Sequence, residues 1–287
     1  MSAQLLEGKV IAGKIKENLQ AEVEALRQKS ACSPKLVSIQ IGEDLASAVY
    51  IKSQKRNAES LGIDYALETL DANVTQQGLA ELISGLNRDK GISGIIVQLP
   101  LPKEIDHRAV MAAISPAKDA EGMHPENLGH LLLGDAKLAP CTAQAAMELI
   151  ESTGVDLYGK EALVVGHSEI VGKPLSMLLL NKFATTAVCH IATGERGLLP
   201  EHVKRAEILV VAVGKAGLVK GEWIKEGAIV VDVGINRLGD KIVGDVEFEQ
   251  AQKRAAYITP VPGGVGPLTV TMLMRNVVNA FKMQHKI

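Results

Sequence analysis

Short apolar runs that end near a glycine and are followed by a helical pattern constrain the fold of this chain most. In the second half of the chain, residues 162–165 form such a run, and a glycine turn and a helical pattern to residue 180 follow it. Similar runs lie at residues 186–190, 207–213, 228–233 and 257–259. Runs without polar alternation are typical of strands buried on both faces. Their alternation with helices predicts an α/β fold with a Rossmann-type parallel sheet.

The first half of the chain predicts a second α/β domain. Helical patterns cover residues 6–28, 44–61 and 74–86, and strand-like runs cover residues 35–41 and 94–99. Asp44 can cap the second of these helices, and Gly62 can end it. A last helical pattern, residues 269–282, can pack back on this half.

Residues 116–142 are the longest stretch without clear periodicity, and they are dense in Pro, Gly, Asn and His. Long irregular loops inside compact domains are often functional. We therefore expect a functional loop here.

Charge and cysteine content exclude several classes of partner. The formal net charge is −2 and the basic stretch 52–56 is short, so nucleic acid is not an expected partner. The N-terminus has no signal pattern, and apolar runs such as residues 208–213 are too short to span a membrane. The three widely spaced cysteines fit neither a disulfide framework nor a zinc site. We expect a cytoplasmic protein without a metal site.

The turn after residues 162–165 has features of a dinucleotide site. Gly166 would let the backbone approach a pyrophosphate, and the following helix start favours negative charge. Ser168 stands where the second glycine of the usual fingerprint would be, so the motif alone also fits a tight turn without ligand. Two further strand ends carry glycine, at Gly214 and Gly234, and ligands of open α/β sheets bind at such ends.

The preference between NAD and NADP stays open. NAD sites usually carry Asp or Glu at the end of the second strand, which here ends at Cys189-His190. His167, His190 and Arg196 could bind a 2′-phosphate, whereas Glu195 would oppose it.

Residues 259–267 hold three prolines and three glycines in nine positions. Proline fixes φ and glycine permits unusual φ, so this segment is expected to be a rigid, sharply turned loop. A domain hinge is the alternative.

Several motifs together resemble one known family. They are Tyr50, the VQLPLP run at residues 97–102, Lys118-Asp119 with Gly122 and His124-Pro125, Pro140-Cys141-Thr142, the Gly166 turn and the 259–267 loop. From about residue 5 to 281, the chain resembles the methylenetetrahydrofolate dehydrogenase/cyclohydrolase family.

The resemblance implies a domain organisation and an activity. A folate-side domain of residues 1–145, completed by helix 268–287, accompanies a Rossmann domain of residues 146–267, with the active-site cleft between them. The family oxidises 5,10-methylene-tetrahydrofolate to the methenyl form with NADP or NAD, and most members then hydrolyse that product to 10-formyl-tetrahydrofolate. Most members are homodimers.

The resemblance also implies the site residues. The catalytic set is Tyr50, Gln54, Gln98 and Glu121. The substrate-binding set is Tyr50, Val97, Gln98, Leu99, Pro100, Asp119, Glu121, Pro262, Gly263 and Gly264. The cofactor-binding set is Gly166, His167, Ser168, Ile170, Val171, Ile191, Thr193, Val213, Gly214, Gly234 and Ile235. Packing is the alternative role for Tyr50, satisfying strand-end backbone groups is that for Gln98, and capping a loop is that for Asp119.

Gln54 departs from the family, which has a lysine four residues after the tyrosine for the cyclohydrolase step. Positions i and i+4 share one helix face, so Gln54 lies beside Tyr50. A lysine can supply charge or transfer a proton, whereas glutamine offers only neutral hydrogen bonds. Lys52, Lys55 and Arg56 point elsewhere. We hypothesise that the dehydrogenase remains and the cyclohydrolase is lost or much reduced.

Other departures keep alternatives open. Glu121 replaces a family aspartate that contacts the pterin, and Ala143 and Ala145 replace a proline and a glycine. The alternatives are a fully bifunctional enzyme, a dehydrogenase of another pterin or one-carbon carrier, and a catalytically weak paralogue that acts as a binding partner.

Overall fold

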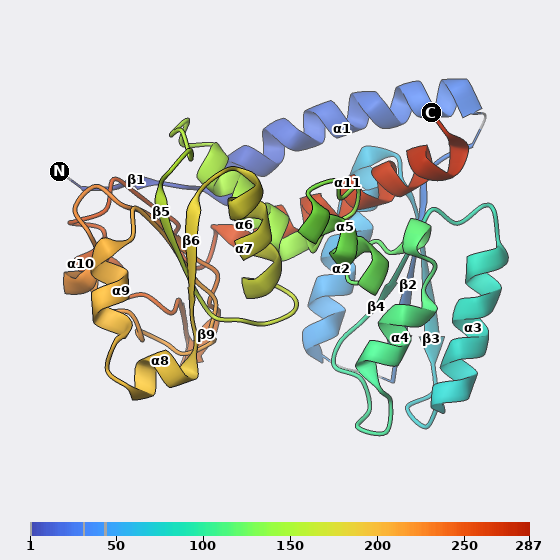
Figure 1. Ribbon diagram of the computed structural model, residues 1–287. Coiled ribbons are helices and arrows are strands. Elements are labelled where there is room, and N and C mark those ends of the chain that lie inside the picture. The colour runs from blue at the N-terminus through green and yellow to red at the C-terminus, as the bar shows by residue number, and fades with distance from the viewer. Residues whose placement is uncertain (1, 31, 43–44) are drawn as a thin grey trace. The chain divides into compact units, whose positions relative to one another are not determined.

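The computed structural model describes residues 2–30, 32–42 and 45–287. It divides into two compact units, and each combines separate stretches of the chain (Figure 1). Unit 1 contains Met1–Gly13 and Thr142–Thr269, and unit 2 contains Lys14–Cys141 and Val270–Ile287. The expected organisation gave the first residues to the folate-side domain. In the structure they join unit 1, because the N-terminal strand β1 (Gln4–Leu5) pairs with β11 (Tyr257–Ile258).

Unit 1 is built on a six-stranded sheet in the order β1-β11-β8-β7-β5-β6, in which every neighbouring pair is parallel. The remaining strands are β5 (Glu161–Val165), β6 (Thr185–Cys189), β7 (Ile208–Val211) and β8 (Ile229–Asp232). An antiparallel hairpin of β9 (Asn236–Leu238) and β10 (Lys241–Val243) follows β8. The expected α/β class with a Rossmann-type parallel sheet is confirmed.

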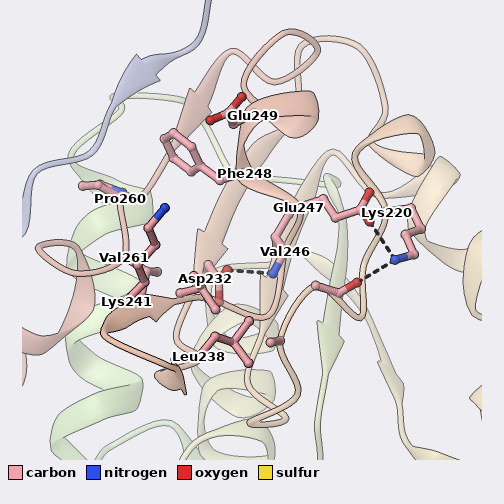
Figure 2. A pocket seen from close by; sticks show the side chains of 14 residues that line it. Lys220, Asp232, Leu238, Lys241, Val246, Glu247, Phe248, Glu249, Pro260 and Val261 are labelled. Atoms are coloured by element: carbon pink, nitrogen blue, oxygen red, sulfur yellow. Dashed lines mark hydrogen bonds and ion pairs between the residues drawn. The ribbon is translucent and has the colours of Figure 1, made fainter.

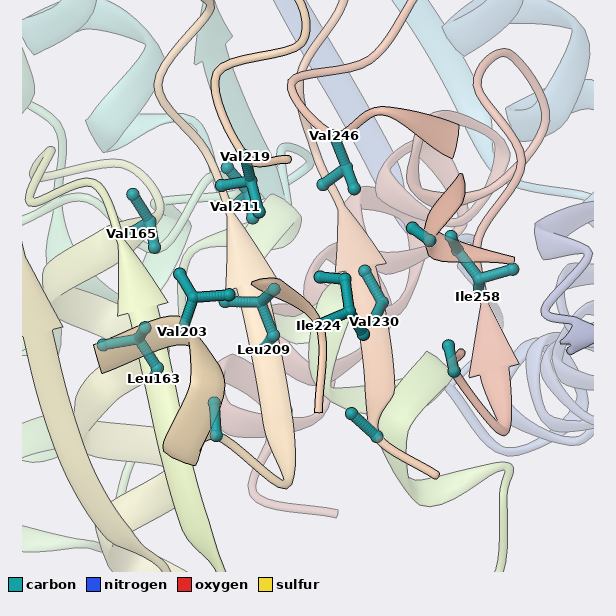
Figure 3. Packing of buried hydrophobic residues seen from close by; sticks show 14 of the residues in the cluster. Leu163, Val165, Val203, Leu209, Val211, Val219, Ile224, Val230, Val246 and Ile258 are labelled. Carbon is teal, nitrogen blue, oxygen red and sulfur yellow. The ribbon is translucent and has the colours of Figure 1, made fainter. Parts of the chain in front are cut away.

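Helices cover both faces of this sheet. They are α6 (Cys141–Glu151), α7 (Gly172–Asn181), α8 (Ile191–Glu195), α9 (Leu199–Arg205) and α10 (Phe248–Ala251), with a 3-10 turn η2 (Gly221–Trp223). Figure 3 shows one face, where Leu163 of β5 and Leu209 of β7 pack with Val203 of α9. Alternate residues such as Val164 and Val210 point to the other face and are also fully buried. Both faces are therefore apolar, as the sequence predicted.

Unit 2 contains a parallel three-stranded sheet in the order β3-β2-β4. The strands are β2 (Lys35–Ile41), β3 (Asp64–Leu70) and β4 (Gly94–Val97). The helical elements are α1 (Gly8–Ser30) and α11 (Val265–His285), which both continue into unit 1, and α2 (Leu45–Leu61), α3 (Gln76–Arg88), α4 (His107–Ala113), η1 (Pro116–Lys118) and α5 (Pro125–Leu133).

Each face of the smaller sheet has its own apolar layer. On one face, Ile39 and Ile95 form a cluster with Leu79 of α3 and Met111 of α4. On the other face, a Cβ added to Gly94 would lie 3.1 Å from Val277, so α11 packs directly on β4. The last helix thus completes unit 2, as the sequence suggested.

The structure differs from the expected local elements in two places. Residues 116–142 are not an irregular loop, because α5 lies within them and α6 begins at Cys141. Strand β3 was missed, because it is an edge strand with several exposed positions and little apolar periodicity. The Asp44 cap lies outside the described residues. Among the described residues, no helix is long and apolar enough to cross a membrane.

The core assignment predicts unequal effects of two isoleucine truncations. Ile39→Ala removes a fully buried side chain of the central strand β2. It should cost about 2–5 kcal/mol of unfolding free energy, measured by urea denaturation. Ile242→Ala, on the hairpin where the side chain is 46% exposed, should change it by less than about 0.5 kcal/mol. Equal urea midpoints for Ile39→Ala and Ile242→Ala would contradict the assignment of Ile39 to the core.

Candidate functional site

The turn between β5 and α7 requires its glycines for packing. Gly166 has φ 120°, and a Cβ there would overlap the carbonyl of Ala212. A Cβ on Gly172, the first residue of α7, would overlap the carbonyl of Gly166. Ser168 Oγ accepts hydrogen bonds from the N–H groups of Val171 at 3.1 Å and Gly172 at 3.4 Å. The turn therefore sets the start of α7 against the end of β5, the geometry that suits a bound pyrophosphate.

A cavity of about 800 Å³ opens at this turn within unit 1. Of the expected cofactor residues, Gly166, His167, Ser168, Ile191 and Val213 line it. The rings of His167 and His190 lie 5.2 Å apart at its edge. Glu195 also lines the cavity, whereas Arg196 does not, so only two of the three proposed cations face it.

The other expected cofactor residues do not line the cavity. Ile170 and Val171 belong to the turn, Thr193 lies in α8, Gly214 follows Val213, and Gly234 and Ile235 follow β8. Lys215, Leu218 and Trp223 also line the cavity, although no sequence pattern predicted them. They lie in loops and in η2, where no periodic pattern points to them.

Asp245, also missed, holds the loop after β7. Its fully buried carboxylate accepts hydrogen bonds from the N–H groups of Val213, Gly214 and Lys215 at 2.7–2.9 Å. It also accepts one from Nδ2 of Asn236 at 2.8 Å. The loop that lines the cavity is thereby tied to the hairpin.

Asp232 makes the matching set of bonds at the end of β8. Its carboxylate accepts from the N–H groups of Gly234 and Asp245. It also accepts from the N–H of Val246, and Figure 2 shows this bond. Burial raises the pKa of Asp232 to about 6, although these bonds act in the opposite direction. A Cβ on Gly234 would overlap the Asp245 carboxylate, and a Cβ on Gly244 would overlap the Asp232 carboxylate. The two aspartates and the two glycines therefore pack against one another in a single cluster.

A second cavity of about 600 Å³ lies beside Asp232 (Figure 2). Lys220 and Glu247 form an ion pair at 2.7 Å in its wall, and Pro260 and Val261 also line it. The expected substrate residues Pro262, Gly263 and Gly264 do not line it. They form the turn before α11, where the Gly8 N–H donates to the Gly263 carbonyl at 2.9 Å.

On unit 2, three of the four expected catalytic residues form one hydrogen-bonded group. Gln98 Nε2 donates to Gln54 Oε1 at 3.1 Å, and Gln54 Nε2 donates to Gln98 Oε1 at 3.4 Å. Gln98 Nε2 also donates to Ser38 Oγ at 2.8 Å. Burial raises the pKa of the Tyr50 hydroxyl, while a hydrogen bond from Gln54 lowers it. The structure thus brings Tyr50, Gln54 and Gln98 together. Lys52, Lys55 and Arg56 are exposed.

The two acidic residues between η1 and α5 have different environments. Asp119 is buried, and its carboxylate accepts from the His124 N–H at 2.7 Å and from Asn127 Nδ2 at 2.8 Å. These bonds fit the loop-capping alternative for Asp119. Burial, with the nearby Asp119 charge, raises the pKa of Glu121 to about 8. At pH 7 the Glu121 side chain is therefore mainly a neutral acid that can donate a hydrogen bond.

Asn276 of α11 holds this loop in place, and the sequence analysis missed it. Its Nδ2 donates to the carbonyls of Ala120 and Ala139, each at 2.9 Å. Cys141 Sγ lies 3.4 Å from the same carbonyl of Ala120. Ala143 and Ala145 are buried in α6, a helix that suits alanine.

Four expected substrate residues, 97–100, follow one another on the chain but differ in exposure. The Val97 side chain is 1% exposed and belongs to the core cluster, so only its main chain could touch a ligand. Leu99 is 42% exposed, and Pro100 is exposed. Gln98 lies between them, on the face opposite to Val97.

The fold and these residues define a two-unit α/β enzyme with a nucleotide-type cavity, and the comparisons specify its family. Residues 6–121 match the model "Tetrahydrofolate dehydrogenase/cyclohydrolase, catalytic domain". Residues 140–285 match the NAD(P)-binding domain of the same family. The chain therefore belongs to the tetrahydrofolate dehydrogenase/cyclohydrolase family, which confirms the resemblance and the expected NADP or NAD cofactor class.

Individual relatives match over the whole length. The chain is 51% identical over 288 residues to the bifunctional protein FolD of Acetivibrio thermocellus, with 100% of both covered. The bifunctional FolD structure of Campylobacter jejuni has a TM-score of 0.94 at 43% identity, covering 98% of this chain and 99% of that one. The Trypanosoma brucei FolD structure, complexed with NADP and an inhibitor, has a TM-score of 0.95 at 40% identity, with 100% of both chains covered.

The bonds to Asp245 predict weaker nucleotide binding when it is changed. Asp245→Asn places an amide NH₂ against backbone N–H donors, which displaces the loop of Val213 and Lys215. A buried donor without an acceptor costs about 1–3 kcal/mol, so the Kd for the nucleotide should rise about 10-fold or more. Quenching of Trp223, the single tryptophan, measures the Kd directly. Asp240→Asn, in the exposed hairpin turn, is the control. The same Kd for both variants would contradict this role.

The raised pKa of Glu121 predicts a pH-dependent stability. Between its ordinary value of 4.5 and about 8, the folded protein keeps a proton that the unfolded chain releases. The free energy of unfolding should therefore fall as pH rises through this window, by about 1.4 kcal/mol per unit of pKa difference at most. Glu121→Gln should flatten the decline between pH 5 and 8 in urea titrations, and the exposed Glu104→Gln should not. Parallel pH profiles for wild type and Glu121→Gln would count against the assignment.

Proposed function

We propose that this chain oxidises 5,10-methylene-tetrahydrofolate to 5,10-methenyl-tetrahydrofolate with NAD or NADP. The observation that carries the proposal is the presence of both domains of the family in one chain. Relatives that match the whole length are named as FolD enzymes, which supports the same activity here.

The residues of unit 1 fit a dinucleotide. The glycine turn admits a pyrophosphate at the start of α7, and the cavity is large enough for a nucleotide and is lined by aromatic and apolar side chains. NAD or NADP, when bound, supplies the acceptor for a hydride. Asp245 holds the loop of Val213 and Lys215, which line that cavity.

The residues of unit 2 are proposed to bind and orient the folate. A hydride leaving the methylene carbon generates a positive charge that the two adjacent nitrogens share, so this step requires alignment rather than a protein base. Tyr50 and Gln98 are proposed to position the pterin. Glu121, as a neutral acid, is proposed to donate a hydrogen bond to it.

The second step of the family, hydrolysis of the methenyl product, has two candidate outcomes. The relatives are named bifunctional, and these names fit the bifunctional alternative better than the loss of hydrolysis expected from the sequence. The amide pair favours the other candidate, a dehydrogenase with weak hydrolysis. Gln54 is fully buried, and its amide is hydrogen-bonded to Gln98, Tyr65 and Tyr50. No amide N–H is therefore left to donate to a water.

Absorbance spectra recorded over time test both steps. Protein is mixed with methylene-tetrahydrofolate and, in parallel, with NAD or NADP. Formation of reduced nicotinamide tests the oxidation, and the faster arm identifies the cofactor. Decay of methenyl above an enzyme-free blank measures hydrolysis.

Gln54→Lys should raise this hydrolysis about 100-fold, because a lysine can supply charge or transfer a proton. Ala48→Lys, which adds a lysine at an exposed position of α2, is the matched control and should leave the rate unchanged. Fast methenyl decay in wild type, with no gain in Gln54→Lys, would establish the bifunctional candidate. No reduced nicotinamide in either arm, together with nucleotide binding, would favour the weak paralogue.

We further propose that the protein is a homodimer in the cytoplasm and that its small-molecule substrate is a folate. The dimer rests on the family resemblance, and size-exclusion chromatography with light scattering measures it.

A further inference from the structure

The C-terminal ends of helices α1 and α11 bring a cysteine and a histidine together (Figure 1). Cys32 follows the end of α1, His285 is the last residue of α11, and both side chains are exposed. Cys32 Sγ lies 3.6 Å from His285 Nε2, although 253 residues separate the two in the sequence. The pair is therefore formed by the packing of the two helices, which the Lys282–Glu22 ion pair at 2.6 Å also joins.

The surroundings of His285 determine which form of its ring faces the thiol. Its Nδ1 lies 2.9 Å from the carbonyl oxygen of Phe281. A carbonyl oxygen can only accept, so Nδ1 carries a hydrogen, and Nε2 of the neutral ring is free of one. That unprotonated nitrogen is the one that faces Cys32 Sγ. The ring also stacks on Phe281, with the two centroids 4.1 Å apart, which holds it in this orientation.

The backbone of Cys32 is held from the side of α1. Ser30 Oγ donates to the Cys32 carbonyl oxygen at 3.1 Å. The arrangement thus contains a thiol, a base and a third group that orients the base, and a base in this position activates a cysteine by taking its proton. The imidazolium that results is favoured where His285 lies, because the C-terminal end of a helix attracts positive charge.

The other two cysteines have environments that oppose reaction. Cys141 and Cys189 are buried, and burial raises the pKa of both thiols. The thiolate is the reactive form of cysteine, so buried thiols with a raised pKa are poor nucleophiles. Cys32 combines exposure with a neighbouring base.

We propose that Cys32 is a modification site, at which His285 activates the thiol for exchange with low-molecular-weight disulfides. His285 Nε2 takes the thiol proton, and Cys32 Sγ attacks one sulfur of the small disulfide. The new S–S bond forms as the old one breaks, and the leaving thiolate takes the proton from the imidazolium. Cys32 is thereby oxidised to a mixed disulfide, and the other half of the small disulfide is reduced to a thiol. The proposal does not rest on the proposed function.

Oxidised glutathione, used as the small disulfide, tests the site. The whole protein is incubated with it at pH 7, and mass spectrometry of peptides follows its attachment to each cysteine. We expect attachment at Cys32 well before Cys141 or Cys189, and release by dithiothreitol. Cys32→Ser should remove the fast phase. Attachment mainly at Cys141 or Cys189 would overturn the proposal.

Variants of His285 test the role of the base. His285→Phe keeps a ring that can stack on Phe281, and it should slow attachment at Cys32 about 3- to 10-fold, because an ordinary thiol is only a few per cent thiolate at pH 7. His285→Gln should be equally slow, which separates loss of the base from altered packing. His130→Phe is the matched control, since His130 is an exposed histidine of unit 2 that bonds to Asp135, and it should leave the rate unchanged. Wild-type rates in both His285 variants would overturn the proposal.

The dependence of the rate on pH separates proton transfer from simple access. Toward pH 9 an ordinary exposed thiol is mostly ionised, so wild type and His285→Phe should then differ by less than about 2-fold. The other charged side chains near the two helix ends are Arg27, Lys29, Lys286 and the Lys282–Glu22 ion pair. Side chains of these types keep their charge between pH 7 and 9. A constant difference across this range would overturn the proposal, because His285 would then act on access to the thiol.

Discussion

The inner parallel strands β4, β5, β7 and β8 are buried on both faces, and that constraint determines where polar side chains can lie. Backbone donors and acceptors are used in the ladders, and side chains such as Val164 and Val210 are fully enclosed. A polar group placed along such a strand would lack a partner unless the fold supplied one. Ser38 is an exception on β2, and its partner is Gln98. Most other polar side chains of the candidate site lie at or beyond strand ends.

Two buried carboxylates hold the loops that follow the strands of unit 1. Burying Asp232 and Asp245 opposes folding, and backbone N–H groups from three loops offset that cost. The same arrangement explains Gly234 and Gly244, since each gives space to the carboxylate of the other segment. On unit 2, the amides of Gln54 and Gln98 satisfy each other in a comparable way. In both units, polar groups inside the protein position the residues expected to contact ligands.

The sequence predicted elements that carry strong local patterns. The apolar runs of β5, β7 and β8 and the glycine turn before α7 were identified within one or two residues. Patterns failed where tertiary contacts decide the structure: β3 is an edge strand with a mixed pattern, and α5 is a short helix started by His124-Pro125 within an apparent loop. In the site, Tyr50, Gln54 and Gln98 came from family motifs. Tyr65, Asp245 and Asn276 could not be predicted, because their roles depend on partners 11, 32 and 156 residues away.

The last helix has a consequence for how the chain reaches its folded state. Residues of α11 such as Met272, Val277 and Phe281 are among the most buried in unit 2, and Asn276 fastens the loop of Ala120 and Ala139. A ribosome makes these residues long after the sheet of β2, β3 and β4 has emerged. During synthesis, one face of that sheet lacks its covering helix while the residues of unit 1 are made. Unit 2 can therefore complete its buried face only after the last helix has been made, although most of its residues are synthesised before those of unit 1.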